Sequence, residues 1–422
     1  MAQILQRQRK GGDFVEKLLE TALTGAQLSP ADRHLCQELA YGIIRWQATL
    51  DWLIARKAEV PIQKPALQDL LRLGLYQIFW LDRIPNHAAV HETVELANRS
   101  GLRRQAGFVN AMLRGYLREL DATEALLAEL KITEPHLGYS HPKWLAARWQ
   151  TRWGGQRAAQ LMEWNNTPPR TFARVNRLKT EPDRLLAQWR EEKVEFDFVQ
   201  HDRLTKDLVF ELKSHPPLSS LPSFRQGLFY IQDPSTLLAV DELGPQPGET
   251  ILDLCAAPGG KLTYIAQLMR NKGRIIAHDT DRERLKLIEE NCERLGVTCV
   301  EVVLPPALKS IRAAGFDRIL IDAPCSNTGV MRRRVDLRWR IRPEEIVRLR
   351  AAQLDLLRQA ALLLKPGGTL VYSTCSLEPD ENQEVVNEFL GAHSGFKLEH
   401  TRELRPFVEN VDGAYVAKLR RD

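Results

Sequence analysis

Two cysteines stand in closely matching sequence settings, Cys325 within DAPCSNTG and Cys375 within YSTCS. Each follows an apolar run that is typical of a buried β-strand, FDRILI before the first and GTLVY before the second. Such runs predict neighbouring strands of a parallel sheet, and the carboxyl ends of parallel strands face one ligand crevice. The sequence therefore predicts that both thiols lie at the same edge of the sheet.

Two thiols at one edge point to covalent catalysis on an electrophilic ring. Carbon 5 of a cytosine is a poor nucleophile, but a thiolate that adds to carbon 6 creates an enamine, whose carbon 5 attacks an electrophilic methyl group. We expect a thiol beside lysine and arginine to have a lowered pKa and more thiolate. Asp322 is placed to bond the N3 and N4 edge of the ring, and Lys261 to neutralise negative charge. The chemistry alone leaves open which thiol attacks.

A glycine-containing turn, DLCAAPGGK, follows another short predicted strand, TILDL. Gly259 and Gly260 let the backbone approach a ligand, and the helix that follows presents free N–H groups. Asp279 ends the next strand nineteen residues after Gly260, a typical place for an acid that binds ribose hydroxyls. The turn is neither a GxGxxG fingerprint nor a GxxxxGKS phosphate loop, so S-adenosyl-L-methionine fits best. An ordinary glycine-rich turn and a Rossmann-type oxidoreductase are the alternatives.

The elements around these motifs alternate between strand and helix over residues 231–422. The strands TILDL, GRIIAHD, VTCVEVV, FDRILID and GTLVYST predict an α/β domain with a doubly wound, mostly parallel, Rossmann-like sheet. Residues 1–130 carry apolar side chains at helical spacing and predict an all-α domain. Residues 131–230 mix short strands and helices and predict a small α+β domain between the other two.

The bulk composition is that of an ordinary globular protein, with 44% hydrophobic and 27% charged residues. No apolar run reaches the roughly 18 residues that a membrane helix needs, and the amino-terminal segment lacks the apolar stretch of a signal peptide. We therefore expect a cytoplasmic protein without a membrane partner. The six cysteines form no CxxC pair and no compact cluster with histidine, which argues against a metal site.

Six arginines gather within eleven residues shortly after Cys325, in a chain whose formal net charge is +5. Guanidinium groups pair bidentately with phosphates and give nucleic-acid binding a strong salt dependence. A solvated basic surface is the simpler interpretation, but the closeness to a candidate nucleophile favours contact with phosphates. The six residues are Arg332, Arg333, Arg334, Arg338, Arg340 and Arg342.

Three motifs, DLCAAPGGK, DAPCSNTG and YSTCSLEPDENQEVV, together resemble those of the RNA cytosine-5 methyltransferases. Upstream, LSPADRHLCQELAYGIIRWQATLDWLI and VNAMLRG resemble the helical RNA-binding domain shared with the antitermination factor NusB, and FARVN and GLFYIQDPS resemble the middle segment of the family. The resemblance spans nearly the whole chain and is to the branch acting on 16S ribosomal RNA. It implies S-adenosyl-L-methionine-dependent methylation of carbon 5 of one cytosine, in an RNA loop or a partly assembled small subunit, through a covalent cysteine–cytosine intermediate.

The resemblance also implies roles for individual residues. Cys375 is implied to be the nucleophile that attacks carbon 6, and Cys325 to assist release. DNA cytosine methyltransferases make the opposite choice, because they attack with the thiol of a Pro-Cys pair. The implied cofactor-site residues are Cys255, Ala256, Ala257, Pro258, Gly259, Gly260, Lys261, Asp279 and Asp322. The expected RNA-binding residues are Arg174 and Asn176, which fall on the Arg-x-Asn segment of the family, and Arg332, Arg333 and Arg334.

One stretch departs from the family pattern. Members usually carry an acid just after the third strand, where it contacts the adenine, whereas this chain has Leu304 and Pro305 near that place. Glu301 or a backbone group is the alternative contact. The departure leaves a second hypothesis open, a catalytically impaired RNA-binding factor of ribosome assembly or antitermination.

Overall fold

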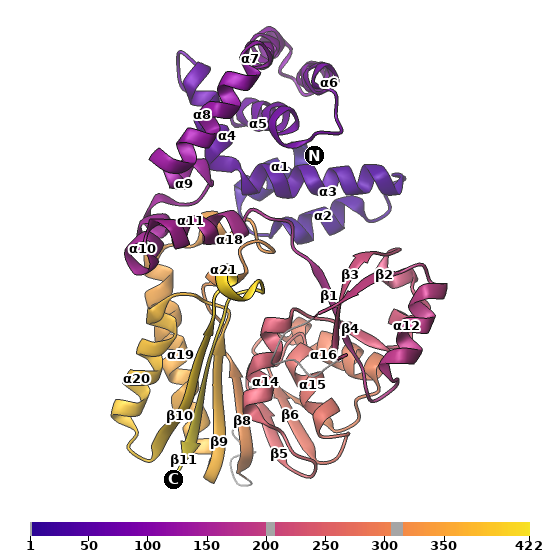
Figure 1. Cartoon of the computed structure of the whole chain (residues 1–422), viewed down its shortest axis with the longest axis vertical. Coiled ribbons are helices and arrows are strands. Elements are labelled where there is room, and N and C mark those ends of the chain that lie inside the picture. The colour runs from indigo at the N-terminus through magenta and orange to yellow at the C-terminus, as the bar shows by residue number, and fades with distance from the viewer. Residues whose placement is uncertain (1, 200–206, 305–314) are drawn as a thin grey trace. The chain divides into compact units, whose positions relative to one another are not determined.

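The computed structural model describes residues 2–199, 207–304 and 315–422, which fall into two compact units (Figure 1). The first unit is helical, and the second holds both β-sheets together with both cysteine motifs and the glycine turn. The first unit comprises Met1–Thr167 and Met331–Arg340, and the second comprises Pro168–Val330 and Ile341–Asp422.

The helical unit confirms the predicted all-α character of the amino-terminal region. Ser29 caps one of its long helices, because its hydroxyl accepts a hydrogen bond from the Asp32 N–H and proline follows in the first turn. The helices are α1 (Ala2–Lys10), α2 (Val15–Leu23), α3 (Pro30–Arg45), α4 (Gln47–Lys57), α5 (Pro65–Trp80), α6 (Asn86–Arg99), η1 (Arg103–Gln105), α7 (Ala106–Arg118), α8 (Leu120–Thr133), α9 (Pro135–Gly138), α10 (Lys143–Trp153), α11 (Gly155–Trp164) and α18 (Leu337–Arg340).

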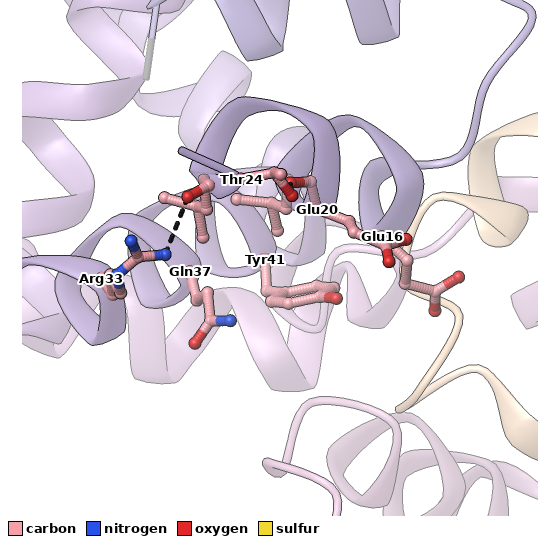
Figure 2. A pocket seen from close by; sticks show the side chains of 8 residues that line it. Glu16, Glu20, Thr24, Arg33, Gln37 and Tyr41 are labelled. Atoms are coloured by element: carbon pink, nitrogen blue, oxygen red, sulfur yellow. Dashed lines mark hydrogen bonds between the residues drawn. The ribbon is translucent and has the colours of Figure 1, made fainter. Parts of the chain in front are cut away.

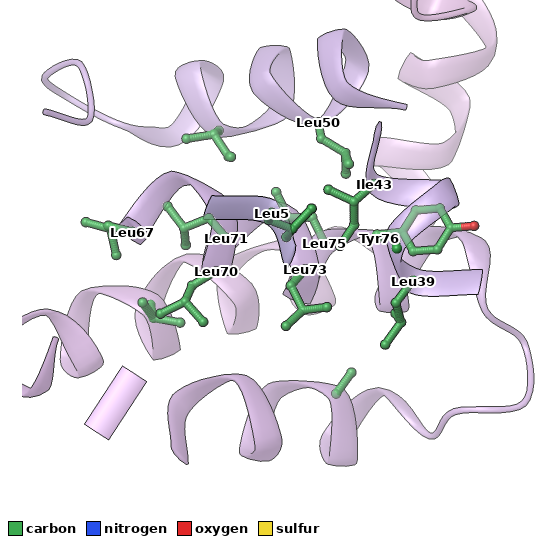
Figure 3. Close-up of a cluster of buried hydrophobic side chains, with 14 of the residues drawn as sticks. Leu5, Leu39, Ile43, Leu50, Leu67, Leu70, Leu71, Leu73, Leu75 and Tyr76 are labelled. Atoms are coloured by element: carbon green, nitrogen blue, oxygen red, sulfur yellow. The ribbon is translucent and has the colours of Figure 1, made fainter. Parts of the chain in front are cut away.

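Aliphatic side chains around α5 form the core of the helical unit (Figure 3). Leu71 and Leu75 on α5 are fully buried, because α1, α3, α4, α6 and α7 all pack against this helix. Leu50 and Ile43, on two of those neighbours, are buried in the same cluster. Burying each such side chain stabilises the fold by roughly 1.5–3 kcal/mol, so packing holds these helices together.

Residues 331–340 fold with the helical unit although they follow the Cys325 motif in sequence. Arg338 is fully buried there and donates hydrogen bonds to the carbonyl oxygens of Arg45, Ser140 and Asn165. A buried guanidinium is retained only where acceptors surround it, so this side chain fixes the segment to three separate parts of the unit.

The helical unit also extends beyond residue 130, where the composition changes. Leu145 and Trp149 on α10 and Leu161 on α11 are buried, and both helices belong to this unit. The reason is long-range, since the carbonyl groups after α9 and α11 bind an arginine that is far away in sequence. The division into three domains stays a prediction.

The smaller sheet of the second unit has four antiparallel strands in the order β2–β3–β1–β4. Trp189 packs edge-on against Phe210 and Phe229 beneath this sheet. The strands predicted in the middle segment are confirmed. The elements are β1 (Thr171–Val175), α12 (Pro182–Glu191), β2 (Glu195–Phe198), β3 (Val209–Ser214), η2 (Leu218–Ser220), α13 (Pro222–Arg225) and β4 (Phe229–Ile231).

The larger sheet has seven strands in the order β10–β11–β9–β8–β5–β6–β7. Strands β7, β6, β5, β8 and β9 are parallel, and β11 pairs antiparallel with both β9 and β10, which confirms the predicted doubly wound, mostly parallel sheet. The chain moves outward from β5 in both directions, so the carboxyl ends of β5 and β8 border the crevice that this topology creates. The strands are β5 (Thr250–Asp253), β6 (Arg274–His278), β7 (Val300–Val303), β8 (Phe316–Asp322), β9 (Leu364–Thr374), β10 (Phe396–Leu404) and β11 (Ala414–Arg421).

Successive residues of these strands enter two different cores. Ile251 and Leu320 face the cluster that contains α14, α15 and α16, whereas Leu252 and Ile321 face the cluster that contains α19 and α20 (Figure 1). Burial on both faces explains why the strands are continuous apolar runs. The covering elements are η3 (Pro234–Leu237), α14 (Leu238–Leu243), α15 (Gly260–Leu268), α16 (Arg282–Leu295), η5 (Thr328–Val330), α19 (Pro343–Leu363), η6 (Pro379–Glu381), α20 (Gln383–Ala392) and α21 (Pro406–Glu409).

Candidate active site

The two cysteine motifs meet at the carboxyl edge of the large sheet. β8 and β9 are adjacent and parallel, with Asp322 opposite Ser373 in the last register position. The chain then turns, and the sulfur atoms of Cys325 and Cys375 lie 3.2 Å apart. The prediction that both thiols occupy one edge is therefore confirmed.

The two thiols differ in exposure. Cys325 is only 8% exposed, whereas Cys375 is half-buried. The hydrogen bond with Cys375, followed by burial, raises the pKa of Cys325 well above its usual range. The expectation of a lowered pKa is therefore wrong for Cys325, because the buried thiol has a sulfur partner rather than a cation. Cys325 stays protonated at neutral pH and can donate its S–H to the other sulfur.

Asn327 links the two cysteine loops. Its Oδ1 accepts a hydrogen bond from the Cys375 thiol at 3.0 Å, and its Nδ2 donates to the carbonyl oxygen of Cys325 at 2.7 Å. Its φ of 56° lies in the left-handed region, which asparagine tolerates better than most residues. Gly329 also approaches closely, since a Cβ there would lie 2.8 Å from the Cys375 carbonyl oxygen. The sequence analysis did not assign Asn327 a role, although it belongs to the DAPCSNTG motif.

Asp322 and Lys261 form an ion pair beside the thiols, with the Lys261 Nζ 2.6 Å from an Asp322 oxygen. The other Asp322 oxygen accepts a hydrogen bond from the Ser373 hydroxyl at 3.0 Å. Burial alone would lower the pKa of Lys261, but attraction by Asp322, Cys375 and other acids reverses this and raises the pKa. A permanent cation thus stands next to the half-buried thiol, as the sequence analysis expected.

Asp253, the last residue of β5, was not assigned a role by the sequence analysis. It is 1% exposed, and burial followed by repulsion from Asp322 raises its pKa to about 7. The Cys255 N–H and Lys261 act against this rise, but within the described residues neither oxygen of Asp253 forms a hydrogen bond. A buried carboxylate without donors fits a ligand that carries N–H groups.

The glycine turn is held by Asp279 and Arg284. An Asp279 oxygen accepts a hydrogen bond from the Ala257 N–H at 3.2 Å, and Arg284 donates to the Ala257 carbonyl oxygen at 2.6 Å. Gly259 has a φ of 102°, a conformation that favours glycine, and it caps α15. The other predicted cofactor residues, Cys255, Ala256, Pro258 and Gly260, lie in the same turn.

The end of β7 carries no acid among its described residues. Leu304 follows this strand and is 40% exposed, and Pro305 lies outside the described residues. Glu301 pairs with Arg274 at 2.6 Å. Because Arg274 is the first residue of β6, this ion pair draws Glu301 toward the amino end of the strands, away from the crevice. Glu301 is therefore not placed as the adenine contact.

Arg174 and Asn176 are buried within the second unit. Arg174 donates hydrogen bonds to the Gln232 side chain, the Gly260 carbonyl oxygen and the Thr263 hydroxyl. Asn176 donates to two backbone carbonyl groups. The Arg174 contacts join the small sheet to the start of α15, which supports the glycine turn, whereas Asn176 binds the end of α16. Both side chains are buried, and their contact with RNA stays a prediction.

The arginine cluster divides by burial. Arg332 is 1% exposed and stacks over the Trp164 ring, with 4.2 Å between the guanidinium carbon and the ring centroid. Arg338 is likewise buried, whereas Arg333 is half-buried and Arg334 is exposed. The expectation of phosphate contact therefore needs correction for Arg332, because its guanidinium is buried and packs over the Trp164 ring. For Arg333 and Arg334 it stays a prediction.

A pocket between α2 and α3 in the helical unit is acidic (Figure 2). Glu16 and Glu20 line it, and burial raises the pKa of Glu16. Its one arginine, Arg33, donates hydrogen bonds to the carbonyl oxygens of Leu23 and Ala26. Carboxylates repel phosphate, so the two glutamates disfavour contact with nucleic acid in this pocket.

Three family models match successive parts of the chain. The model described as 16S rRNA methyltransferase RsmB/F matches residues 240–420, and that of the NusB family matches residues 1–118. The ferredoxin-like domain model of RsmF/B-like methyltransferases matches residues 141–206.

Curated relatives extend the likeness over nearly the whole chain. The probable ribosomal RNA small subunit methyltransferase B of Bacillus subtilis is 37% identical over 96% of this chain and 94% of its own length. The ribosomal RNA small subunit methyltransferase B of Klebsiella pneumoniae is 38% identical over 93% of this chain and 91% of its own length. This chain belongs to the ribosomal RNA small subunit methyltransferase B family.

Solved structures agree with this family. A methyltransferase homolog protein from Pyrococcus horikoshii matches with a TM-score of 0.59 and 33% identity, over 68% of this chain and 97% of its own. NSun6 from Pyrococcus horikoshii, solved with SFG, matches with a TM-score of 0.59 and 25% identity, over 66% of this chain and 98% of its own. The sheet is thus the methyltransferase fold that the family shares.

Two further findings concern metals and membranes. In the part of the chain that the structure describes, no group of three or more histidine, cysteine, aspartate or glutamate side chains is arranged to hold a metal ion. No helix among these residues combines the length and the apolar character that crossing a bilayer requires.

Proposed function

We propose that this member of the family methylates carbon 5 of one cytosine of 16S ribosomal RNA, as an enzyme of the type that modifies cytosine 967. The reaction passes through a covalent cysteine–cytosine intermediate. The supporting observation is the pair of sulfur atoms 3.2 Å apart, at the carboxyl ends of two parallel strands. A cytoplasmic location and a substrate in an RNA loop or a partly assembled subunit belong to this proposal. A target base must leave its stack to reach such a site.

Cys375 is the nucleophile in this proposal, because it is the more exposed thiol and lies near Lys261. Its Sγ forms a bond to carbon 6, and carbon 5 gains electron density. After carbon 5 has taken a methyl group, a solvent base removes its proton, and the electron pair of that C–H bond forms the double bond between carbon 5 and carbon 6. The bond between Sγ and carbon 6 breaks in the same elimination, and sulfur leaves as a thiolate with that electron pair. Cys325, protonated and 3.2 Å away, hydrogen bonds to the nucleophile and assists this last stage.

Asp322 and Lys261 stabilise the activated ring. The Asp322 carboxylate accepts a hydrogen bond from the cytosine N4 amino group, and Lys261 offsets the negative charge that builds up after the thiolate adds. The Ser373 hydroxyl holds one oxygen of Asp322 and so limits its rotation. Preorganised charge of this kind lowers the barrier, because it needs no rearrangement during the reaction.

The residues of the glycine turn fit S-adenosyl-L-methionine, which supplies the methyl group as a sulfonium when bound. Asp253 offers two buried oxygens that accept no hydrogen bond from the described residues, which suits the ammonium group of the methionine portion. Asp279 directly follows β6, a place where an acid typically binds ribose hydroxyls. The other residues proposed to hold the cofactor are Cys255, Ala256, Ala257, Pro258, Gly259, Gly260, Lys261 and Asp322.

Methyl transfer to defined RNA tests this proposal. Purified protein, S-adenosyl-L-methionine and 16S ribosomal RNA from cells that lack the enzyme should yield one new bisulfite-resistant cytosine. A parallel reaction with assembled small subunits tells which substrate is used. Methyl groups on another base, or a methylated cytosine that bisulfite still converts, would contradict the assignment to carbon 5 of cytosine.

The second candidate is an RNA-binding factor without methylation activity, and the observation that favours it is Leu304 where family members usually carry an acid. Calorimetry separates the two. Heat of binding from S-adenosyl-L-methionine supports the enzyme, and tight RNA binding without such heat supports the RNA-binding factor.

A further inference from the structure

We propose that Glu381 is a positioning residue that holds the two thiol loops in register; the inference rests on the proposed function of that site. Glu381 is fully buried at the end of η6. Its Oε1 accepts hydrogen bonds from the Ser326 N–H at 2.8 Å and from Gln353 at 3.1 Å. Its Oε2 accepts from the hydroxyl of Ser326 and, at 2.6 Å, from that of Ser376.

The two serines make this carboxylate a link between the thiols. Ser326 directly follows Cys325, and Ser376 directly follows Cys375. Their hydroxyl oxygens lie 3.0 Å apart and both contact Glu381. Because each serine is joined to its cysteine by one peptide bond, one buried group fixes the backbone on both sides of the sulfur pair.

Neighbouring side chains hold Glu381 itself in place. Gln353 on α19 donates to both Glu381 and the Pro324 carbonyl oxygen, so it joins the carboxylate to the residue before Cys325. The Tyr372 hydroxyl donates to the backbone carbonyl oxygen of Glu381 at 2.6 Å. These contacts come from α19 and β9, and they fix the carboxylate from two rigid elements.

The next residue, Asn382, fixes the Cys375 loop separately. Its Oδ1 accepts from the Thr374 hydroxyl at 2.6 Å, and its Nδ2 donates to the Ser376 carbonyl oxygen at 2.9 Å. Among the described residues, the Asn382 side chain therefore forms hydrogen bonds on both sides of Cys375 and none with the Cys325 loop. Glu381, like Asn327, couples one loop to the other.

A positioning role explains why a carboxylate stands here. A buried charge is costly and is retained where several donors satisfy it. The side chain touches neither sulfur within hydrogen-bond distance, so it acts through Ser326 and Ser376. Misplacing a reacting atom by about 1 Å can slow a reaction by roughly a hundredfold, so register between the loops matters for the rate.

Oxidative cross-linking measures this register without RNA or cofactor. Diamide oxidises two neighbouring thiols to a disulfide, and the two hydrogens reduce its diazene to a hydrazine. We expect a Cys325–Cys375 disulfide in the wild-type protein, identified by peptide mapping and reversed by dithiothreitol. Glu381→Ala should slow its formation by about tenfold, whereas Glu381→Gln, which keeps an acceptor and the side-chain length, should stay within about threefold of wild type. Glu384→Gln, at an exposed acid on α20, is the matched control.

Steady-state methylation supplies the second readout. Glu381→Ala should lower kcat about tenfold to a hundredfold with little change in the KM for RNA, and Glu381→Gln should restore most of it. If Glu381→Ala unfolds the protein, the Ser326→Ala/Ser376→Ala double variant replaces it, because it removes only hydroxyl groups. Equal cross-linking in wild type and in the folded Ala or double variant would overturn the proposal, as would Glu381→Gln behaving like Glu381→Ala. Normal cross-linking behaviour in a protein that methylates no cytosine would instead refute the proposed function alone.

Discussion

The loops of Cys325 and Cys375 follow adjacent strands and carry the same Cys-Ser pair, yet their thiols stand in unlike surroundings. Cys325 is buried, and its pKa is raised first by the Cys375 sulfur and then by desolvation. Cys375 is half-buried and lies near a cation. The two similar motifs thus suit different roles. The nucleophile, Cys375, must be accessible to the base, whereas the assisting thiol, Cys325, must be close to that sulfur but can be buried.

Replacing the more exposed thiol should have the largest effect. We expect Cys375→Ala to reduce methylation by on the order of 10⁴-fold or more, since the proposed nucleophile that forms the bond to carbon 6 is removed. Cys375→Ser is the matched control and should be nearly as inactive, because a hydroxyl does not ionise at neutral pH. Incorporation of labelled methyl groups into RNA measures the loss, and retained activity in either variant would break the distinction between the thiols.

Removing the buried thiol should slow the release of the RNA rather than the attack on carbon 6. We expect Cys325→Ala to accumulate a covalent RNA–protein complex, because the bond to Cys375 forms but is released slowly. The complex is seen as a shifted band on a denaturing gel, and the Cys325→Ala/Cys375→Ala double variant should lack it. A trapped band from the single Cys375 variant would reverse the two roles.

The carboxylates Asp253 and Asp322 show the same contrast, because Asp253 is buried and Asp322 is half-buried. The pKa of Asp253 is raised to about 7 by burial, so its ionised form, which suits an ammonium group, prevails only at higher pH. We expect S-adenosyl-L-methionine to bind more tightly at pH 8 than at pH 6, and about tenfold more weakly and with little pH dependence in Asp253→Asn. Calorimetry at both pH values measures this, with Glu283→Gln on α16 as control.

Asp253 should also shape stability in the absence of cofactor. Its folded pKa is raised above the unfolded value, so the stability it contributes is present at acidic pH and is lost as pH rises toward about 7. The wild-type Tm should therefore fall over this range relative to the Asp253→Asn variant. A constant difference in Tm would show that the carboxyl group finds a donor inside the protein.

The arginines provide the smallest expected effects. Arg334→Ala should reduce the slope of log affinity for RNA against log salt by about one, because one phosphate contact is lost. Arg332→Ala should leave that slope unchanged and lower the free energy of unfolding by about 1–3 kcal/mol, because its guanidinium packs over Trp164. Salt titrations and denaturant unfolding of both variants decide whether burial separates binding arginines from packing ones.

Much of the fold follows from local sequence pattern. Continuous apolar runs predict the strands β5, β6, β8 and β9, because a strand buried on both faces has no polar side. Glycine at the end of a strand predicts the turn before α15, and its left-handed φ at Gly259 is the reason. Strand adjacency and the parallel direction then place two strand-end thiols together, as the 3.2 Å between their sulfurs confirms.

The candidate site was only partly predictable. The pairing of Asp322 with Lys261 follows from two strand-end motifs that meet at one edge. Asn327 and Glu381 escaped notice because their partners belong to the other cysteine loop, about fifty residues away in sequence, and no periodicity reports such a contact. Asp253 gave a signal as an acid before the glycine turn, but its lack of donors is visible only in the folded chain.

By itself, the sequence determined which residue types stand at the ends of the parallel strands, and therefore which chemistry the edge of the sheet can support. The tertiary structure decided which members of each like pair are covered, as for Cys325 beside Cys375 and Arg332 beside Arg334. The physical reason is that strand and helix periods depend on neighbours along the chain, whereas desolvation and hydrogen-bond partners depend on segments that only folding brings together.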